Sequence, residues 1–94
     1  MKPVERISAF VKLGKAIQDL NPEDKEELLW RAENNNNWFT KDSVESALEG
    51  ISSMLSEEKL DAWLSIYDLK EVGNPQSIGL MMAGNIPAVG FHDL

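Results

Sequence analysis

The apolar pattern of this chain changes near Gly73-Asn74-Pro75, and that change limits the folds available to it. Before this turn signal, apolar residues recur three and four positions apart, which is the period of an amphipathic helix. After it, residues 78 to 83 form one short and almost wholly apolar run between turn-forming residues. The sequence therefore predicts a helical domain over residues 1–72 and a segment of different character over residues 73–94.

Four helices are predicted in the first segment, and three of them have a recognisable start. Asn21, Thr40 and Ser56 are placed to cap the second, third and fourth helices with their side chains. Gly50 stands where a helix end favours glycine, so residues 52 to 55 are expected to form a connector. The expected helices are Val4–Leu20, Pro22–Glu33, Lys41–Glu49 and a fourth that opens at Ser56 and extends to Tyr67.

One small hydrophobic core is expected between these helices. A chain of 94 residues with 43% apolar residues can form a single small domain. The pair Trp38-Phe39 is also expected to be buried, because large aromatic side chains dominate the cores of small domains. The fold class is therefore mainly α, a small four-helix domain followed by a linker and an orphan strand or loop. The side chains expected in the core are Phe10, Leu29, Leu48, Leu60, Trp63 and Leu64.

Composition excludes several classes of partner. The formal charge is −7, with 16 acidic against 9 basic residues, and nucleic-acid binding needs clustered Lys and Arg instead. No apolar run reaches the ~18 residues of a membrane span. Without cysteine there are no disulfides, and a cytoplasmic location is expected. The acidic residues Glu23, Glu26 and Glu27 are interpreted as a solvated helix face rather than a metal site, because hard-cation loops alternate carboxylates along a turn with glycine.

The stretch from Ile78 to Leu94 is the one place where the sequence indicates chemistry. Residues 78–83 suit a strand buried on both faces, and Pro87 suits the first turn of a following helix. Asn85, held at that turn by Gly84 and Pro87, can donate a hydrogen bond to an oxygen that gains negative charge. The alternative is an asparagine that only closes its own turn. His92-Asp93 is interpreted as part of a helix turn, since one histidine cannot build a catalytic or metal site.

The end of the chain also carries a family resemblance. The block Met82-Ala83-Gly84-Asn85-Ile86-Pro87, continued by Gly90-Phe91-His92-Asp93-Leu94, resembles the start of the cofactor domain in fatty acyl-CoA reductases of the luminescence type. These enzymes belong to the aldehyde dehydrogenase superfamily, whose corresponding loop reads Pro-Trp-Asn-aromatic-Pro. Here the asparagine and the second proline agree, whereas the first proline and both bulky residues differ. The spacing of aromatic residues upstream, at Trp38, Trp63 and Tyr67, is similar to the helical lead-in of that family.

The resemblance implies that the chain is the N-terminal part of an enzyme that reduces a fatty acyl-CoA to an aldehyde with NADPH through an acyl-cysteine intermediate. It assigns the oxyanion-donor role to Asn85 and cofactor binding to Ala83 and Gly84. Its partners would be the remainder of its own chain and the acyl-CoA. Because no cysteine is present, the nucleophile would lie beyond Leu94, and the 94-residue chain alone is expected to be inactive.

The alternative function is a stand-alone helical protein-interaction module that presents its apolar tail to a partner. In either case, residues 78–83 are not expected to form a strand without strand partners. Residues after about Gly73 are then expected to be mobile or to fold over the exposed face of the helices. Association between molecules through this tail is the competing expectation.

Overall fold

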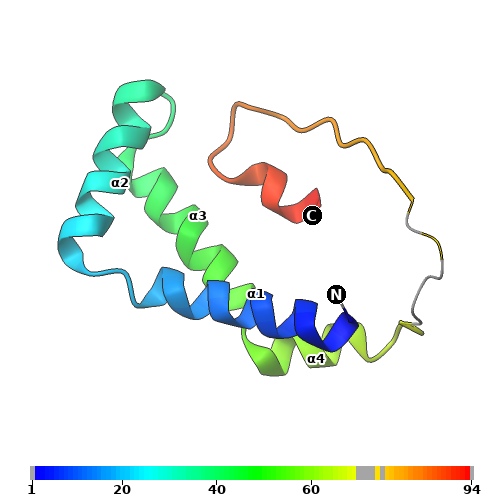
Figure 1. The fold of residues 1–94 in the computed structure, drawn as a ribbon. Coiled ribbons are helices and arrows are strands. Elements are labelled where there is room, and N and C mark those ends of the chain that lie inside the picture. The colour runs from blue at the N-terminus through cyan, green and yellow to red at the C-terminus, as the bar shows by residue number, and fades with distance from the viewer. Residues whose placement is uncertain (1, 70–73, 75, 94) are drawn as a thin grey trace.

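The computed structural model describes residues 2–69, 74 and 76–93, without the side chains of His92 and Asp93. The described residues form four α-helices and a short 3₁₀ helix, and no strand occurs among them (Figure 1). The protein is therefore mainly α, as predicted. Its elements are α1 (Pro3–Gln18), α2 (Pro22–Asn35), α3 (Lys41–Met54), α4 (Glu57–Leu64) and the 3₁₀ helix η1 (Val89–Asp93).

The helices begin where the sequence predicts them. The side-chain oxygens of Asn21, Thr40 and Ser56 each accept a hydrogen bond from the backbone N–H three residues later, at 2.8, 3.3 and 3.4 Å. Pro3 and Pro22 occupy the first helical positions of α1 and α2, where a missing N–H costs nothing. These local signals confirm the three predicted caps.

The third helix is longer than predicted, and the fourth is shorter. Helix α3 continues through Gly50 to Met54, so placing Gly50 beyond its end was wrong, and so was the connector over residues 52 to 55. The extension adds Ile51 to the apolar face and ends at the buried cap residue Leu55. Burying two such side chains outweighs the ~1 kcal/mol that a glycine costs inside a helix. Helix α4 ends at Leu64 rather than Tyr67.

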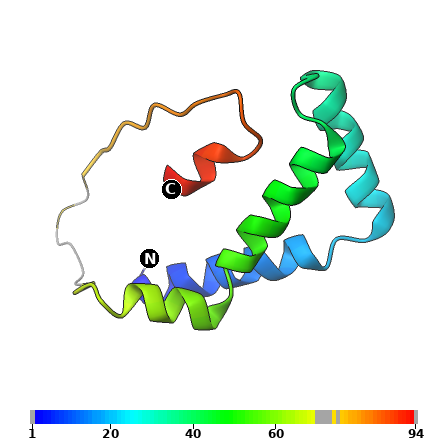
Figure 2. The same cartoon turned by 180° about the vertical axis from the view of Figure 1, so that it is seen from behind.

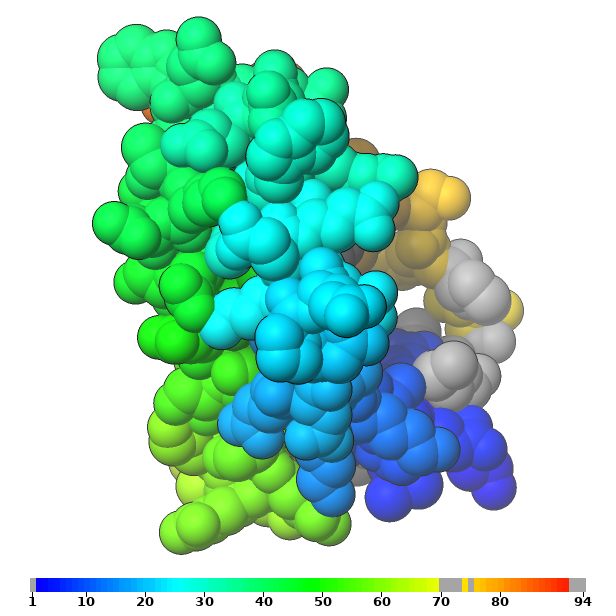
Figure 3. Space-filling view, turned by 90° about the vertical axis from the view of Figure 1, so that its left-hand side faces the viewer, coloured from blue at the N-terminus to red at the C-terminus, as the bar shows by residue number. Residues whose placement is uncertain are grey.

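The helices form an open arrangement rather than a closed bundle. Helices α2 and α3 run antiparallel as a hairpin, and Figure 3 shows them side by side along one face of the molecule. Helices α3 and α4 both pack against α1 (Figures 1 and 2), and the three meet in one shared cluster. Helix α1 therefore contacts both α3 and α4 and holds the domain together.

The core lies where α1, α3 and α4 meet. Val11, Ile51, Leu55 and Leu60 form one buried cluster, and Leu29 and Val44 are buried where α2 meets α3. Four partly buried side chains pack against the first cluster: Ile7, Phe10, Ile17 and Phe91.

Gly14 allows α1 to approach the end of α3 closely. This glycine is buried in the middle of α1, and a Cβ atom added to it would lie 2.7 Å from the Cβ of Leu55. Real side chains do not approach so closely. A glycine is thus required at this helix crossing, although it weakens the helix that contains it.

The predicted core was correct in part. Leu29 and Leu60 are buried, whereas Phe10, Leu48 and Leu64 are only half-buried. Trp63 is 59% exposed, so its placement in the core was wrong. Because α4 packs mainly against α1, it buries only one stripe, which passes through Leu60 and leaves Trp63 at the edge.

The expected burial of Trp38 was also wrong. Trp38 lies in the turn between α2 and α3 and is 83% exposed, while its neighbour Phe39 is half-buried. The turn follows the run of four asparagines, of which Asn34 and Asn35 still belong to α2. A side chain at the tip of a helical hairpin has no third helix to cover it.

The predicted domain boundary after residue 72 lies outside the described residues, as does much of the predicted linker. Among the described residues, no helix is both long and apolar enough to span a bilayer.

Candidate functional site

The tail, residues 76 to 93, carries at residues 78 to 83 the apolar run that the sequence singles out. It is an extended chain that arches beside the helices and then returns to them (Figure 2). Ile78, Leu80, Met81 and Met82 are all exposed, Met81 completely. No hydrogen bond joins the backbone of residues 76 to 85 to another described residue. The segment is thus apolar, and its backbone has no hydrogen-bond partner within the described chain.

The tail returns to the helices through η1. The Phe91 ring packs edge-on against the Phe10 ring, with centroids 6.2 Å apart and an interplanar angle of 83°. The Phe91 N–H donates to the Ala88 carbonyl at 3.0 Å, and Met82 lies against Gly90 with no room for a Cβ there. Only this end of the tail folds onto the helices, whereas residues 78, 80, 81 and 82 of the apolar run, which were expected to seek burial there, are exposed.

Asn85 lies in the bend between the extended segment and η1, at a shallow groove. Its side chain is exposed and has no hydrogen bond to another described residue. Asn85 therefore does not close its own turn through its side chain in this structure, and its amide is available to another molecule. The groove is lined by Asn85, Ile86 and Pro87 of the tail, by Trp38 of the turn between α2 and α3, and by four residues of α3: Asp42, Ser43, Ser46 and Ala47.

Ala83 and Gly84, the predicted cofactor-binding residues, are both exposed beside Asn85. No described glycine, Gly84 included, has a positive φ. The positive φ, 56°, falls instead on Ala88. A Cβ on Gly84 would meet nothing within 4 Å, so no described contact requires glycine at this position.

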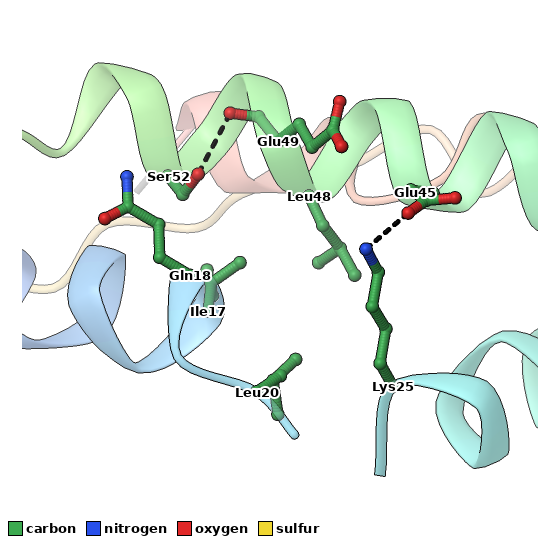
Figure 4. A pocket seen from close by; sticks show the side chains of 8 residues that line it. All are labelled: Ile17, Gln18, Leu20, Lys25, Glu45, Leu48, Glu49 and Ser52. Carbon is green, nitrogen blue, oxygen red and sulfur yellow. Dashed lines mark hydrogen bonds and ion pairs between the residues drawn. The ribbon is translucent and has the colours of Figure 1, made fainter. Parts of the chain in front are cut away.

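A second hollow of about 240 Å³ lies between the end of α1, the start of α2 and the middle of α3 (Figure 4). Lys25 forms an ion pair with Glu45 across it, and this hydrogen bond raises the pKa of Lys25 above its ordinary value of 10.5. The Ser52 hydroxyl donates to the Glu49 carbonyl at 3.0 Å. Lys25, Glu45 and Ser52 are thus engaged in hydrogen bonds or ion pairs, and this hollow presents no activated nucleophile.

The acidic residues at the start of α2 form a solvated face, as interpreted from the sequence. Glu23, Glu26 and Glu27 are all exposed. Glu26 forms an ion pair with Lys41, whose pKa is raised by this hydrogen bond, and Glu27 lies 2.8 Å from Arg31. Within the described part of the chain, no group of three His, Cys, Asp or Glu side chains converges as metal ligands would. The side chains of the predicted His92-Asp93 pair lie outside the description.

No protein-family model, curated protein or solved structure matches this chain. The function is therefore argued from the residues themselves. Sequence reasoning identified Asn85 but missed the juxtaposition of its loop with Trp38. The four-asparagine turn does signal that Trp38 sits at a hairpin tip, but nothing local indicates that the tail returns to that tip.

Proposed function

We propose that this chain is the N-terminal part of an acyl-CoA reductase that converts a fatty acyl-CoA to an aldehyde with NADPH through an acyl-cysteine intermediate. The observation that carries the proposal is the state of Asn85. Its amide is exposed and lacks a hydrogen-bond partner among the described residues, directly after an apolar segment that is itself uncovered. A solvent-facing amide with no structural task is suited to act on a substrate.

In this proposal Asn85 stabilises charge rather than forming a bond. When a cysteine thiolate supplied by the remainder of the chain attacks the thioester carbonyl, negative charge develops on the carbonyl oxygen. The Asn85 amide N–H groups donate to that oxygen, and coenzyme A leaves to give the acyl-cysteine. NADPH, when bound, would supply a hydride to the acyl carbon; the C–S bond would then break, which releases the aldehyde and returns the cysteine thiolate. One such donor is typically worth about 10²- to 10³-fold in kcat.

Ala83 and Gly84 fit the cofactor-binding role in their size and exposure. Both carry little or no side chain, and the space beside Gly84 is free of other described atoms within 4 Å. A bound nucleotide can therefore approach the backbone here without displacing a side chain.

The remainder of the chain is the partner proposed for residues 78–83. Ile78 is 82% exposed. It belongs to an uncharged apolar run, and runs of this kind are typical of strands that are buried on both faces. In the proposed enzyme these residues form a strand of the cofactor domain, whose other strands come from beyond Leu94.

The test begins with the reading frame that encodes this chain. The proposal predicts that the frame continues past Leu94 into a cysteine-containing domain, and that the full-length protein forms aldehyde from acyl-CoA and NADPH. Asn85→Ala should then lower kcat about 100-fold to 1000-fold. Asn74→Ala, which removes an exposed amide just before the tail, should leave kcat unchanged. A stop codon directly after Leu94, or an Asn85→Ala enzyme with full activity, would refute the proposal.

A second candidate function is a helical interaction module. The observation that favours it is the exposed aromatic pair at the end of α4, where the rings of Trp63 and Tyr67 pack edge-on with centroids 6.1 Å apart. Ile66 beside them is 74% exposed. A stop codon after Leu94 would favour this function over the reductase.

A further inference from the structure

The tail differs from the rest of the chain in charge. Between Glu71 and His92 the sequence has no Asp, Glu, Lys or Arg, although the whole chain carries a formal charge of −7. Two copies of the protein therefore repel each other along most of their surfaces, but not where their tails meet. An uncharged apolar stretch excludes a polyanionic or strongly basic partner and matches a second uncharged apolar stretch.

The tail is also already extended. Residues 76 to 83 have neither helix nor strand, and none of their backbone groups is hydrogen-bonded to another described residue. In an extended chain, alternate side chains point to the same side, so Ile78, Leu80 and Met82 can share one face. An uncovered segment with open N–H and C=O groups is a template for pairing with another chain.

We propose that two copies of this chain associate through their tails, with residues 78–82 paired antiparallel about a two-fold axis at Leu80. In this register Leu80 faces Leu80 of the second copy, and Ile78 faces Met82. Six large apolar side chains then gather on one face of the two-stranded ribbon, and Gly79 and Met81 occupy the other. A self-complementary pairing of this kind is the usual form of a two-fold interface.

The register follows from the side chains. Moving the pairing by one residue would place Met81 opposite Leu80 and divide the large side chains between the two faces. A two-stranded ribbon alone is only marginally stable in water. Its apolar face must therefore be covered by the helices of the two copies. The inference concerns the 94-residue chain and uses the exposure, backbone and charge of residues 76 to 83. In the proposed reductase the same residues would pair with strands of the cofactor domain instead, so the two pairings are alternatives for this segment.

Sedimentation velocity of the 94-residue chain tests the association. We expect a concentration-dependent equilibrium between monomer and dimer in the micromolar to submillimolar range. Raising NaCl from about 0.05 M to about 0.5 M should tighten the dimer by up to about tenfold, because salt screens the repulsion between two acidic molecules. A monomer at every concentration and salt level would overturn the proposal, and so would a dimer that weakens with salt.

Two matched substitutions locate the interface. Leu80→Lys should abolish the dimer without loss of helical circular dichroism, because Leu80 is exposed and outside the core. Trp63→Lys introduces the same charge at another exposed apolar side chain, on α4, and should leave the dimer intact. A dimer that survives Leu80→Lys, or that Trp63→Lys abolishes, would contradict the proposed interface.

Cysteine cross-linking tests the register, since the chain has no thiol of its own. Leu80→Cys should form an intermolecular disulfide on mild oxidation, because directly opposed Cβ atoms lie about 4.5–5.5 Å apart. Ile78→Cys is the control, because its equivalent in the second copy would be about 13 Å away along the strand. Efficient cross-linking through Ile78→Cys, with none through Leu80→Cys, would refute the register.

Discussion

The helical part, residues 2–69, and the tail, residues 76–93, are both rich in apolar side chains but differ in what covers them. In the helical part Ile51 and Leu55 are 4% and 5% exposed, because α1, α3 and α4 converge on them. In the tail Ile78 is 82% exposed, and Phe91 is the side chain that reaches the core cluster. Burial in this chain therefore depends on neighbouring elements more than on composition.

The same difference separates the structural residues from the candidate functional ones. Buried residues of the helices have defined partners, and their substitution should change stability. Asn85 and its neighbours in the tail have no such partners, so their substitution should leave the stability of the helices unchanged. The predictions below test this separation, from the largest expected effect to the smallest.

Removing a core side chain should have the largest effect. Ile51→Ala should lower the free energy of unfolding by about 2–5 kcal/mol, because it leaves a cavity in the buried cluster. Met81→Ala, at a fully exposed position of the tail, should change it by less than about 0.5 kcal/mol. Urea unfolding of the two variants measures both values. Equal losses would show that the tail is part of the cooperative core.

Two glycine substitutions should change the free energy of unfolding in opposite directions. Gly14→Ala should lower the free energy of unfolding by up to ~2 kcal/mol, because overpacking against Leu55 exceeds the gain in helix propensity. Gly50→Ala should raise it by about 0.5–1 kcal/mol, because a Cβ there meets nothing within 4 Å. Thermal melts of both variants test the close crossing of α1 and α3. A stabilising Gly14→Ala would show that the helices do not approach so closely.

Replacing Ala88 with glycine should stabilise the conformation at the end of the tail. Ala88 has a φ of 56°, a region that costs an L-residue about 1 kcal/mol and glycine almost nothing. Ala88→Gly should therefore slow hydrogen exchange of the Phe91 amide, which donates to the Ala88 carbonyl, by up to about fivefold. Ala83→Gly, in the extended segment, is the control and should not slow it. Faster exchange in Ala88→Gly would mean that residue 88 has a negative φ in solution.

Raising the pH should have the smallest effect, confined to the helical part. The pKa of Lys25 is raised above 10.5 by its hydrogen bond to Glu45, and that of Lys41 by its bond to Glu26. A raised pKa means that the stabilisation is complete below about pH 10.5 and is lost as the pH rises through the higher folded values. The thermal midpoint should fall slightly over that range, and Glu45→Gln should reduce the fall. An unchanged slope in Glu45→Gln would show that this pair adds no stability.

The helix starts could be predicted because their causes are local. Asn21, Thr40 and Ser56 are caps in the sequence and in the structure. The end of α3 could not be predicted from local signals. Gly50 favours the end of a helix, but contacts of Ile51 with helices distant in sequence outweigh that preference. Trp63 was misplaced for a similar reason, since spacing shows which side chains share a stripe but not how many helices cover it.

The candidate site could be predicted in composition but not in placement. The loop of Asn85 was identified from Gly84, Pro87 and the preceding apolar run, all adjacent in sequence. Its position beside Trp38 depends on the return of the tail, where Phe91 meets Phe10. A contact between the two ends of a chain leaves no periodic signal in either segment.

Hydrogen exchange at residue resolution, at a concentration where the chain sediments as a monomer, tests most directly whether the helices fold as a unit and the tail is appended to it. The amides of Val11 and Ile51 should exchange only on global unfolding, and those of Ile78 to Ala83 at nearly the rate of a free peptide. Strong protection of Ile78 to Ala83 in the monomer would contradict the account, because the chain would then supply strand partners of its own.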